Sequence, residues 1–364
     1  MSDEVDQHVL RKYELMQKLG KGAYGIVWRA TDKRVGESVA LKKIFDAFQN
    51  STDAQRTFRE VMFLQELCGH DHIVTLLNVL KADNDRDLYL VFEYLETDLH
   101  AAIRANVLQD IHQRYILWQT LVALKFMHSA DLLHRDMKPS NLLLNSDCLM
   151  KVADFGLARS MTEVNNVDVE SPILTDYVAT RWYRAPEILM GSTQYTFGVD
   201  MWAVGCILGE MLAGKAIFPG SSTMDQLERI LELTGQPSNE ELASLGSPYA
   251  ATMIASCADI DEPSEATWRA SFPNASEDAL DLIRQLLQFD PMKRPSAEQC
   301  LEHPYVAQFH DPAVERVALR KVQVVIDDNS KKSTAVYRER LYHEITKLKK
   351  RNKETHAPSK NLVD

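Results

Sequence analysis

The feature that most constrains this chain is a set of short strings that follow one another in a fixed order. A glycine-rich string, Gly-Lys-Gly-Ala-Tyr-Gly, occupies 20–25, and Val-Ala-Leu-Lys follows at 39–42. His-Arg-Asp comes next at 134–136, with an asparagine five positions beyond its aspartate. Asp-Phe-Gly at 154–156 and Ala-Pro-Glu at 185–187 complete the set. A glycine-rich string also occurs by chance or as a tight turn, so the order of the strings is more informative than any one of them.

The spacing of apolar residues predicts strands early in the chain and mostly helices afterwards. Residues 13–44 alternate apolar and polar positions and are interrupted by glycines, which predicts a strand, a glycine-rich turn and further strands. Residues 53–67 carry apolar side chains at helical spacing, and 73–92 read as two more strands around a polar turn. From Asp98 onward helical patterns dominate. The clearest of these helices cover 115–128, 277–289 and 297–303.

We therefore expect an α+β protein with two lobes. The smaller lobe, 13–95, is rich in strands, and the larger lobe, 96–309, is mostly helical. The larger lobe carries a looser insert near 219–263, where Pro, Ser, Asn and Gly are scattered among short apolar runs. An extension follows at 310–364, and its apolar spacing predicts a basic amphipathic helix near its end.

Composition excludes several classes of protein. The net charge of −11, from 41 basic and 52 acidic side chains, argues against a nucleic-acid binder or a general membrane-surface binder, because both need a basic footprint. The most apolar stretch, 199–217, contains three charged residues and predicts a buried helix, so no membrane span is expected. The five cysteines form no CxxC pair, which favours a reducing compartment over a disulfide framework or a zinc site. The acidic start of the chain is unlike a signal peptide. We expect a cytoplasmic location, with the nucleus as a second candidate.

The ordered strings supply the groups that phosphoryl transfer from ATP requires. Glycines at the first turn let backbone N–H groups approach the phosphates of ATP. Lys42 would contact the α and β phosphates if an acidic residue on the next helix paired with it, whereas most single lysines are simply solvated. Glu60 is the best-placed partner, and Glu66 is its competitor.

The later strings supply proton transfer and metal binding. Asp136 would accept or orient the proton of the substrate hydroxyl, and Lys138 would offset charge on the transferred group. Asn141 and Asp154 would bind Mg²⁺, because carboxylate and amide oxygens suit a hard cation that keeps part of its water shell. A lone Asp or Asn is usually a turn residue or a helix cap, but both strings are present in the right order.

On these residues the chain resembles the eukaryotic protein kinases over about 13–309, and more narrowly the mitogen-activated protein kinases. That family carries Thr-x-Tyr in its activation lip, and here Thr175, Asp176 and Tyr177 precede Val-Ala-Thr-Arg-Trp-Tyr-Arg-Ala-Pro-Glu. The middle aspartate, and Tyr-Arg-Glu-Arg-Leu-Tyr at 337–342, are similar to the atypical extracellular-signal-regulated branch, although some plant members share the lip. The resemblance implies a Ser/Thr protein kinase that uses ATP and Mg²⁺ on protein substrates with Ser/Thr-Pro sites. It also implies activation by phosphorylation of both lip hydroxyls, performed by the kinase itself.

The resemblance also assigns further residues. The ATP-binding set would be Leu19, Gly20, Gly22, Gly25, Val27, Ala40, Lys42, Phe92, Glu93, Leu95 and Leu143. In this set Phe92 would be the bulky gatekeeper of the rear pocket. Phosphate on the lip threonine would be bound by Arg59, Arg135 and Arg159, and phosphate on the lip tyrosine by Arg181 and Arg184, because guanidinium forks suit phosphate oxygens.

Two matters stay open at this stage. Family members have an acidic groove that docks basic partner motifs, and only Asp311 and Glu315 remain of it here, close to Arg316, Arg320 and Lys321, so docking partners stay an open question.

Another proline-directed kinase, such as a cyclin-dependent one, would share the string around Ala-Pro-Glu but lacks the lip tyrosine. A pseudokinase scaffold is a third possibility, although every catalytic position here holds the expected type of residue.

Overall fold

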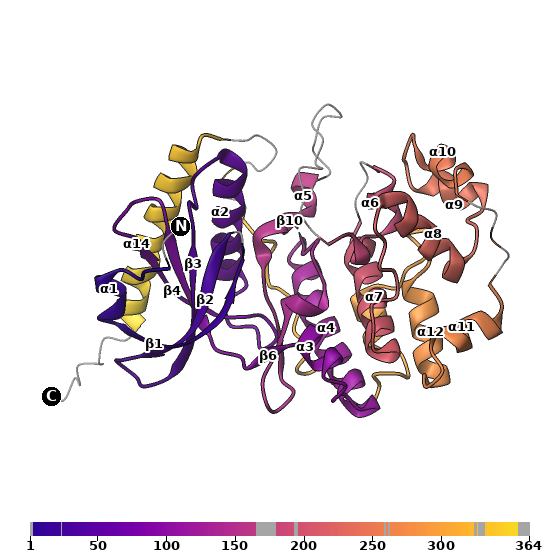
Figure 1. Ribbon diagram of the computed structural model, residues 1–364, viewed down its shortest axis with the longest axis horizontal. Helices are drawn as coiled ribbons and strands as arrows, with labels where there is room; N and C mark the ends of the chain where they lie inside the picture. Colours follow the sequence, from indigo (N-terminus) through magenta and orange to yellow (C-terminus); the bar gives the residue numbers. More distant parts are fainter. Residues whose placement is uncertain are drawn as a thin grey trace. The chain divides into compact units, whose positions relative to one another are not determined.

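The computed structural model describes most of the chain, and its backbone divides into two compact units (Figure 1). The residues described are 3–22, 24–164, 180–192, 196–257, 260, 263–323, 326 and 332–355. The first unit comprises 1–65, 75–94 and 330–364, and the second comprises 66–74 and 95–329. The sequence predicted 310–364 as a separate extension, whereas in the structure its two halves belong to different units.

The first unit is built on a five-stranded antiparallel sheet in the order β1-β2-β3-β5-β4. Its strands are β1 (Tyr13–Lys21), β2 (Gly25–Asp32), β3 (Ser38–Ile44), β4 (Leu76–Lys81) and β5 (Leu88–Glu93). Its helices are α1 (Gln7–Leu10), α2 (Ser51–Glu66) and α14 (Thr334–Thr355). Every strand that the alternating pattern predicted is present, and the predicted helix 53–67 begins two residues earlier than expected.

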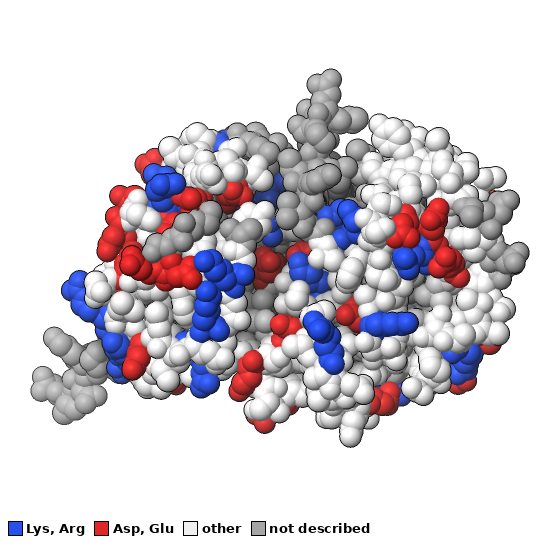
Figure 2. All heavy atoms as spheres, viewed as in Figure 1, with Lys and Arg blue, Asp and Glu red and all other residues white. Residues whose placement is uncertain are grey.

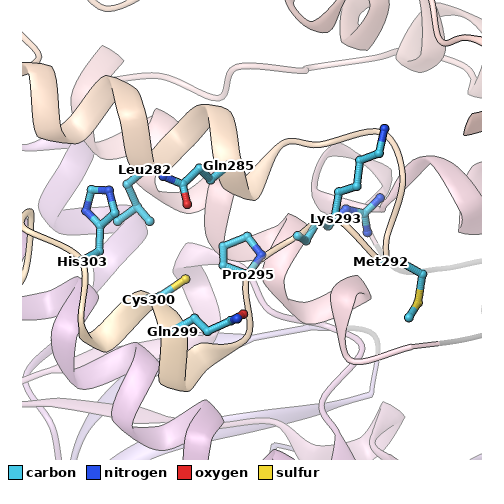
Figure 3. A pocket seen from close by; sticks show the side chains of 9 residues that line it. Leu282, Gln285, Met292, Lys293, Pro295, Gln299, Cys300 and His303 are labelled. Carbon is cyan, nitrogen blue, oxygen red and sulfur yellow. The ribbon is translucent and has the colours of Figure 1, made fainter.

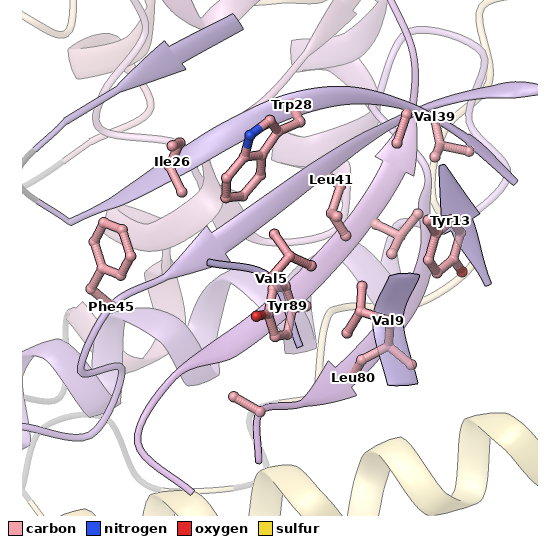
Figure 4. Close-up of a cluster of buried hydrophobic side chains, with 13 residues drawn as sticks. Val5, Val9, Tyr13, Ile26, Trp28, Val39, Leu41, Phe45, Leu80 and Tyr89 are labelled. Carbon is pink, nitrogen blue, oxygen red and sulfur yellow. The ribbon is translucent and has the colours of Figure 1, made fainter. Parts of the chain in front are cut away.

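One face of this sheet is the core of the first unit. Figure 4 shows side chains from α1 and from the strands pointing toward one another, among them Val9, Tyr13, Trp28, Leu41 and Tyr89. All of these are at most 7% exposed. Because side chains alternate across a strand, the neighbours of these core residues must lie on the opposite face of the sheet.

Helix α14 packs against the same unit through one stripe of side chains. Tyr337, Leu341 and Ile345, which recur every four residues, are at most 3% exposed. The ring of Tyr337 lies 5.8 Å from that of Phe58 on α2. The predicted amphipathic helix of the extension is therefore confirmed, and its apolar stripe is buried on the strand-rich unit.

The second unit is mainly helical. Its helices are α3 (Leu99–Arg104), α4 (Asp110–Ser129), α5 (Met161–Val164), α6 (Pro186–Leu189), α7 (Gly198–Ala213), α8 (Thr223–Thr234), α9 (Asn239–Ser244), α10 (Ala250–Ala255), α11 (Glu265–Ser271), α12 (Glu277–Leu286) and α13 (Ala297–Leu301). Its short strands are β6 (Thr97–Asp98), β7 (Leu132–Leu133), β8 (Leu142–Leu144), β9 (Met150–Val152) and β10 (Arg159–Ser160). Three 3₁₀ turns cover Pro139–Asn141, Phe155–Leu157 and Arg181–Tyr183.

Serine caps define where many of these helices start. Ser222, Ser238, Ser264, Ser276 and Ser296 each accept a hydrogen bond from the backbone N–H three residues later. Such caps satisfy an otherwise unpaired N–H in the first helical turn. They help to explain why the insert near 219–263 contains the regular helices α8 and α9, although its sequence looked loose. No helix among the described residues is long and apolar enough to cross a bilayer.

Candidate functional site

In the first unit, the face of the sheet opposite the core carries the residues predicted to contact ATP. Val27 on β2 lies opposite Lys42 on β3, and Ala40 lies opposite Phe92 on β5. These four residues are half-buried, whereas the alternating neighbours Val39 and Leu41 are buried in the core. The strand register therefore brings together residues that lie up to 65 positions apart in the sequence.

Lys42 is paired with the acidic residue that the sequence favoured. Its Nζ atom lies 2.6 Å from Oε1 of Glu60 on α2, and the two side chains are 29% and 8% exposed. The competitor Glu66 instead accepts from Arg320 at 3.0 Å. The structure thus presents an ammonium group beside the sheet face that carries Val27 and Ala40, held there by a carboxylate.

Among the predicted glycines, Gly25 is the one that packing requires. A Cβ atom built on Gly25 would lie 2.2 Å from the carbonyl oxygen of Lys43, so a larger residue would force the strands apart. Gly20 and Gly22 have open space around them, and the N–H of Gly22 closes the turn onto the carbonyl of Gly25. Leu19, which precedes this turn, is 43% exposed.

In the second unit, a compact polar cluster surrounds Asp136. Lys138 donates from Nζ to Oδ2 of Asp136 at 2.6 Å. The amide nitrogen of Asn141 donates to the same oxygen at 3.1 Å and to the Asp136 carbonyl at 2.8 Å. The side chains of Asp136 and Asn141 thus lie together, and the Asn141 amide oxygen is directed away from the carboxylate that its nitrogen contacts.

The loop that carries this cluster is fixed by a residue that the sequence did not single out. Asp200, on α7, is fully buried and accepts hydrogen bonds from the backbone N–H of His134 and of Arg135, both at 2.9 Å. It also accepts from Nε2 of His128 at 3.0 Å. Arg135 has a left-handed backbone with φ of 67°, which needs such external support.

Electrostatics agrees with an ionised Asp200. Burial alone would raise the pKa of this carboxyl group, but the hydrogen bond and charge of His128, with the nearby His134, outweigh burial and lower the pKa. The carboxylate therefore remains charged inside the unit and holds the loop through two backbone amides. The only sequence signal for it was a charged residue inside the most apolar stretch.

Asp154 lies in a strained turn just after β9, and hydrogen bonds of the preceding residue tie this turn to the loop that carries Asp136. Its backbone is left-handed with φ of 63°, and its carboxylate accepts from the N–H of Gly156. The preceding Ala153 donates its N–H to the carbonyl of Asn141, and its own carbonyl accepts from His134 at 3.0 Å. A carboxylate and an amide oxygen on two segments tied together in this way fit the donor preference of Mg²⁺.

Leu143 and Leu95, the residues of the second unit that were predicted to contact ATP, are both half-buried. Leu143 is half-buried between the buried Leu142 and Leu144 of β8, so it lies on the face of that strand away from the core. Leu95 is also half-buried. Ala153, where some kinases carry a cysteine, has no thiol to modify.

The segment after the lip is anchored by contacts that the sequence did not predict. The Tyr183 hydroxyl donates to Oε2 of Glu210 at 2.6 Å. Burial raises the pKa of Tyr183, the neighbouring Glu210 raises it further, and burial likewise raises the pKa of Glu210. Arg181 donates to the carbonyl of Ser221 at 2.8 Å, and the Trp182 indole donates to the carbonyl of Gly220 at 3.1 Å.

Glu187, the last residue of the Ala-Pro-Glu string, forms a buried ion pair. Its two carboxylate oxygens accept from Nη1 and Nη2 of Arg294 at 2.7 and 2.8 Å. Both side chains are 0% exposed. The guanidinium is further satisfied by the carbonyls of Gly198, Gln288 and Phe289, which a buried charge requires.

The predicted phosphate-binding arginines cannot be tested against their targets, because Thr175 and Tyr177 lie outside the described residues. Arg135 contacts the carbonyl of Leu157 at 3.3 Å, and Arg159 lies on β10, which pairs with β7. Arg59, on α2 beside Glu60, is 7% exposed. These assignments stay predictions.

Of the two acidic residues suspected to remain of a docking groove, Asp311 is exposed but Glu315 is buried, so they do not form an accessible acidic patch. Glu315 is 2% exposed, and its Oε1 accepts from the Trp118 indole at 2.9 Å and from the N–H of Asp311 at 3.1 Å. His310 lies 2.8 Å from the same oxygen. On the face in Figure 2, Lys and Arg are interspersed with Asp and Glu rather than forming one basic area.

A pocket of about 320 Å³ lies elsewhere in the second unit (Figure 3). Its lining comes from α12, the loop after it, α13 and the turn that follows α13. The lining residues are Leu282, Gln285, Met292, Lys293, Arg294, Pro295, Gln299, Cys300 and His303. None of the site residues predicted from the sequence lines it.

Comparison with known proteins agrees with these geometries. The protein kinase domain family matches residues 13–306. Extracellular signal-regulated kinase 2 of Dictyostelium discoideum is 61% identical over 356 residues, which are 97% of this chain and 96% of that protein. Mitogen-activated protein kinase 15 of Xenopus laevis is 55% identical over 95% of this chain and 59% of its own length. Extracellular signal-regulated kinase 7 of Drosophila melanogaster is 43% identical over 98% of this chain and 40% of its own length.

The chain therefore belongs to the protein kinase family. Within that family it is a mitogen-activated protein kinase of the atypical extracellular-signal-regulated branch, as the sequence predicted. Its activity is that of a serine/threonine protein kinase, and its fold is the bilobal α+β fold with a strand-rich and a helical lobe.

Proposed function

We propose that this kinase transfers the γ-phosphate of ATP to Ser or Thr residues that precede Pro, and that it phosphorylates Thr175 and Tyr177 of its own lip. The observation that carries the proposal is that two clusters of polar side chains are already assembled. Lys42 pairs with Glu60, and Asp136 contacts Lys138 and Asn141. Lys42 and Glu60 come from a strand and a helix, and the loop with Asp136 is held by the distant Asp200, which is the kind of fixed placement that catalysis by positioning requires.

The roles of these groups follow from their chemistry. Lys42 binds the α and β phosphates, and Glu60 keeps its ammonium group in place. Asn141 and Asp154 hold Mg²⁺, which neutralises phosphate charge when bound. Asp136 accepts the proton of the substrate hydroxyl. Lys138, which already contacts that carboxylate, offsets charge on the transferred phosphoryl group.

Removal of one metal-binding carboxylate tests this assignment. Asp154→Ala should abolish Mg²⁺-ATP-dependent phosphorylation of a generic basic protein by the purified chain, because phosphate charge is left uncompensated. Asp147→Ala, an exposed aspartate in the turn before β9, is the matched control and should retain wild-type activity. Full activity of the Asp154 variant would remove the metal site from this position.

The preference for proline has a physical rationale in the segment after the lip. Contacts to Ser221, Gly220 and Glu210 anchor residues 181–183 there. We propose that the substrate residue after the phosphorylated Ser or Thr faces kinase backbone that offers no hydrogen-bond acceptor. Any residue other than proline would leave its backbone N–H unpaired there, whereas proline has no N–H. An array of peptides should show Ser-Pro favoured over Ser-Ala and Ser-Arg, and equal rates for all three would contradict this proposal.

Autophosphorylation is tested in a host that lacks kinases of this family. Wild-type chain made in bacteria should carry phosphate on Thr175 and Tyr177 when mapped by mass spectrometry. Lys42→Arg should carry neither, and Lys33→Arg, an exposed lysine of the same unit, should match the wild type. Wild-type protein that emerges unphosphorylated, and gains activity only from an added dual-specificity kinase, would establish a conventional cascade instead.

Partners and location are part of the same proposal. The partners are protein substrates with Ser/Thr-Pro sites, and docking of basic motifs finds no support at Glu315, which is buried. The cytoplasm is the proposed location, with the nucleus second. Fluorescence imaging of tagged protein is the direct measurement, and secretion of the protein would exclude this location.

A further inference from the structure

The turn that ends α4 lies just before the short strand β7, which leads into the loop that carries His134, Arg135 and Asp136, called the catalytic loop below. This turn contacts two other segments of the second unit. Asp131 sits in this turn with a left-handed backbone, φ 66°, and its N–H bonds to the carbonyl of His128 at 3.0 Å. Its side chain is only 13% exposed. A non-glycine residue in this conformation needs support from its surroundings.

One set of contacts joins Asp131 to the start of the activation segment, the stretch that runs from Asp154 toward the lip. Oδ2 of Asp131 accepts from the Ser160 hydroxyl at 3.2 Å, from the Thr162 N–H at 3.0 Å and from the Thr162 hydroxyl at 2.5 Å. The Asp131 carbonyl accepts from the N–H of Met161 at 2.9 Å. A single residue thereby fixes the three consecutive residues at the junction of β10 and α5.

A second set of contacts joins the same turn to 318–322, a segment without helix or strand that we call the strap. Oδ1 of Asp131 lies 3.3 Å from Nζ of Lys321. The N–H of Val322 bonds to the carbonyl of Ala130, and the N–H of Ala318 bonds to the Ser129 hydroxyl, both at 2.8 Å. Three consecutive residues of the turn therefore each contact the strap.

We propose that Asp131 is a positioning residue that couples the strap to the start of the activation segment. Its two carboxylate oxygens face different segments, one the strap lysine and the other the donors of residues 160 and 162. Displacement of the strap removes the cation from one side of the carboxylate and so loosens its hold on the other. Because β10 pairs with β7, which leads directly into the catalytic loop, the strap then influences the placement of the segment that carries the lip.

This coupling rests on the proposed role of the lip, but its first test does not use activity. Hydrogen exchange of the full-length kinase without nucleotide compares peptides that cover 157–164 and 316–323. Lys321→Ala removes the ion pair with Asp131 and leaves the two backbone contacts of the strap in place. Thr162→Ala removes the hydroxyl that donates to Asp131 and keeps the backbone N–H donor. Arg320→Ala is the matched control, because Arg320 is the adjacent strap cation and pairs with Glu66 rather than Asp131.

The expected result is reciprocal. Lys321→Ala should speed exchange in 157–164 by about two- to fivefold, the range for loss of one partly exposed ion pair. Thr162→Ala should speed exchange in 316–323, and Arg320→Ala should leave 157–164 unchanged. Effects confined to the mutated segment in both variants would overturn the coupling. The failure of lip autophosphorylation, by contrast, would leave this exchange result intact.

A kinetic readout separates positioning from mere folding stability. Lys321→Ala should lower kcat for a protein substrate while KM for ATP stays unchanged, because the strap contacts described above are to Ser129, Ala130 and Asp131, none of them assigned to nucleotide binding. Asp131→Asn should show a larger loss of the same kind, since the amide has one acceptor oxygen, which can face Lys321 or the Thr162 donors but not both. Equal kcat in Lys321→Ala and in wild type, together with unchanged exchange, would assign Asp131 a purely local role.

Discussion

The two units prepare their catalytic groups in different ways. In the second unit, the loop with Asp136 is held by the buried carboxylate of Asp200 through two backbone amides and a histidine. In the first unit, Lys42 on β3 pairs with Glu60 on α2 and keeps a side-chain exposure of 29%. A fully buried network of hydrogen bonds is rigid, whereas an ion pair whose lysine is partly exposed to water is held less firmly. We therefore expect the catalytic groups of the helical unit to be held more firmly than the Lys42–Glu60 pair of the strand-rich unit.

The largest effect should come from the chemistry of the rigid unit. Asp136→Asn should lower kcat by about 10²- to 10⁴-fold, because the amide cannot accept the proton of the substrate hydroxyl. The affinity for ATP, measured by nucleotide titration, should stay within about twofold, since this residue acts on the hydroxyl and not on the phosphates. An equal loss of nucleotide affinity would contradict the role assigned to it.

The buried ion pair of the second unit should matter more for stability than any exposed pair. Glu187→Ala leaves the guanidinium of Arg294 buried without its carboxylate and should lower the free energy of unfolding by about 3–5 kcal/mol. Glu265→Ala, which removes an exposed partner of Arg269 on α11, should cost at most about 1 kcal/mol. Urea unfolding curves of the two variants make the comparison, and similar midpoints would show that burial is not what stabilises this unit.

The first unit should be sensitive to the helix that covers it. Tyr337→Ala removes a fully buried ring beside Phe58 on α2 and should cost about 3 kcal/mol through the cavity it leaves. Because α2 also carries Glu60, kcat should fall together with stability. Val336→Ala, on the exposed side of the same helix turn, should change the unfolding free energy by less than about 0.5 kcal/mol. Unchanged kcat in the Tyr337 variant would separate α14 from the Lys42–Glu60 pair.

Acid should weaken the second unit through a buried histidine. Burial, with the nearby His72, lowers the pKa of His70 to about 4, whereas an unfolded chain keeps the ordinary value near 6.5. A histidine whose pKa is lowered by folding favours the neutral form, so its stabilising contribution is complete above about pH 6.5 and is lost as pH falls toward 4. The loss should reach about 2–3 kcal/mol at most. His70→Leu should flatten this part of the stability curve in melts recorded between pH 4 and 7, and an unchanged slope would exclude His70.

Much of the fold follows from interactions between near neighbours in the sequence. Alternation of apolar residues placed the five strands of the first unit, because one face of a strand must be buried. Apolar spacing did the same for the helix near the end of the chain, where Tyr337, Leu341 and Ile345 recur every four residues, whereas the serine caps of the insert went unrecognised. The ordered strings identified Lys42, Asp136, Asn141 and Asp154, since chemistry needs these residue types whatever their surroundings.

Only the tertiary structure decided which distant residues support that chemistry. Asp200 reaches the catalytic loop across more than 60 residues, and Arg294 reaches Glu187 across 107. The burial of Glu315 against Trp118 depends in the same way on how elements pack. A charged side chain looks the same in the sequence whether it is solvated or buried. Its role is set by the desolvation and the hydrogen-bond partners that packing alone provides.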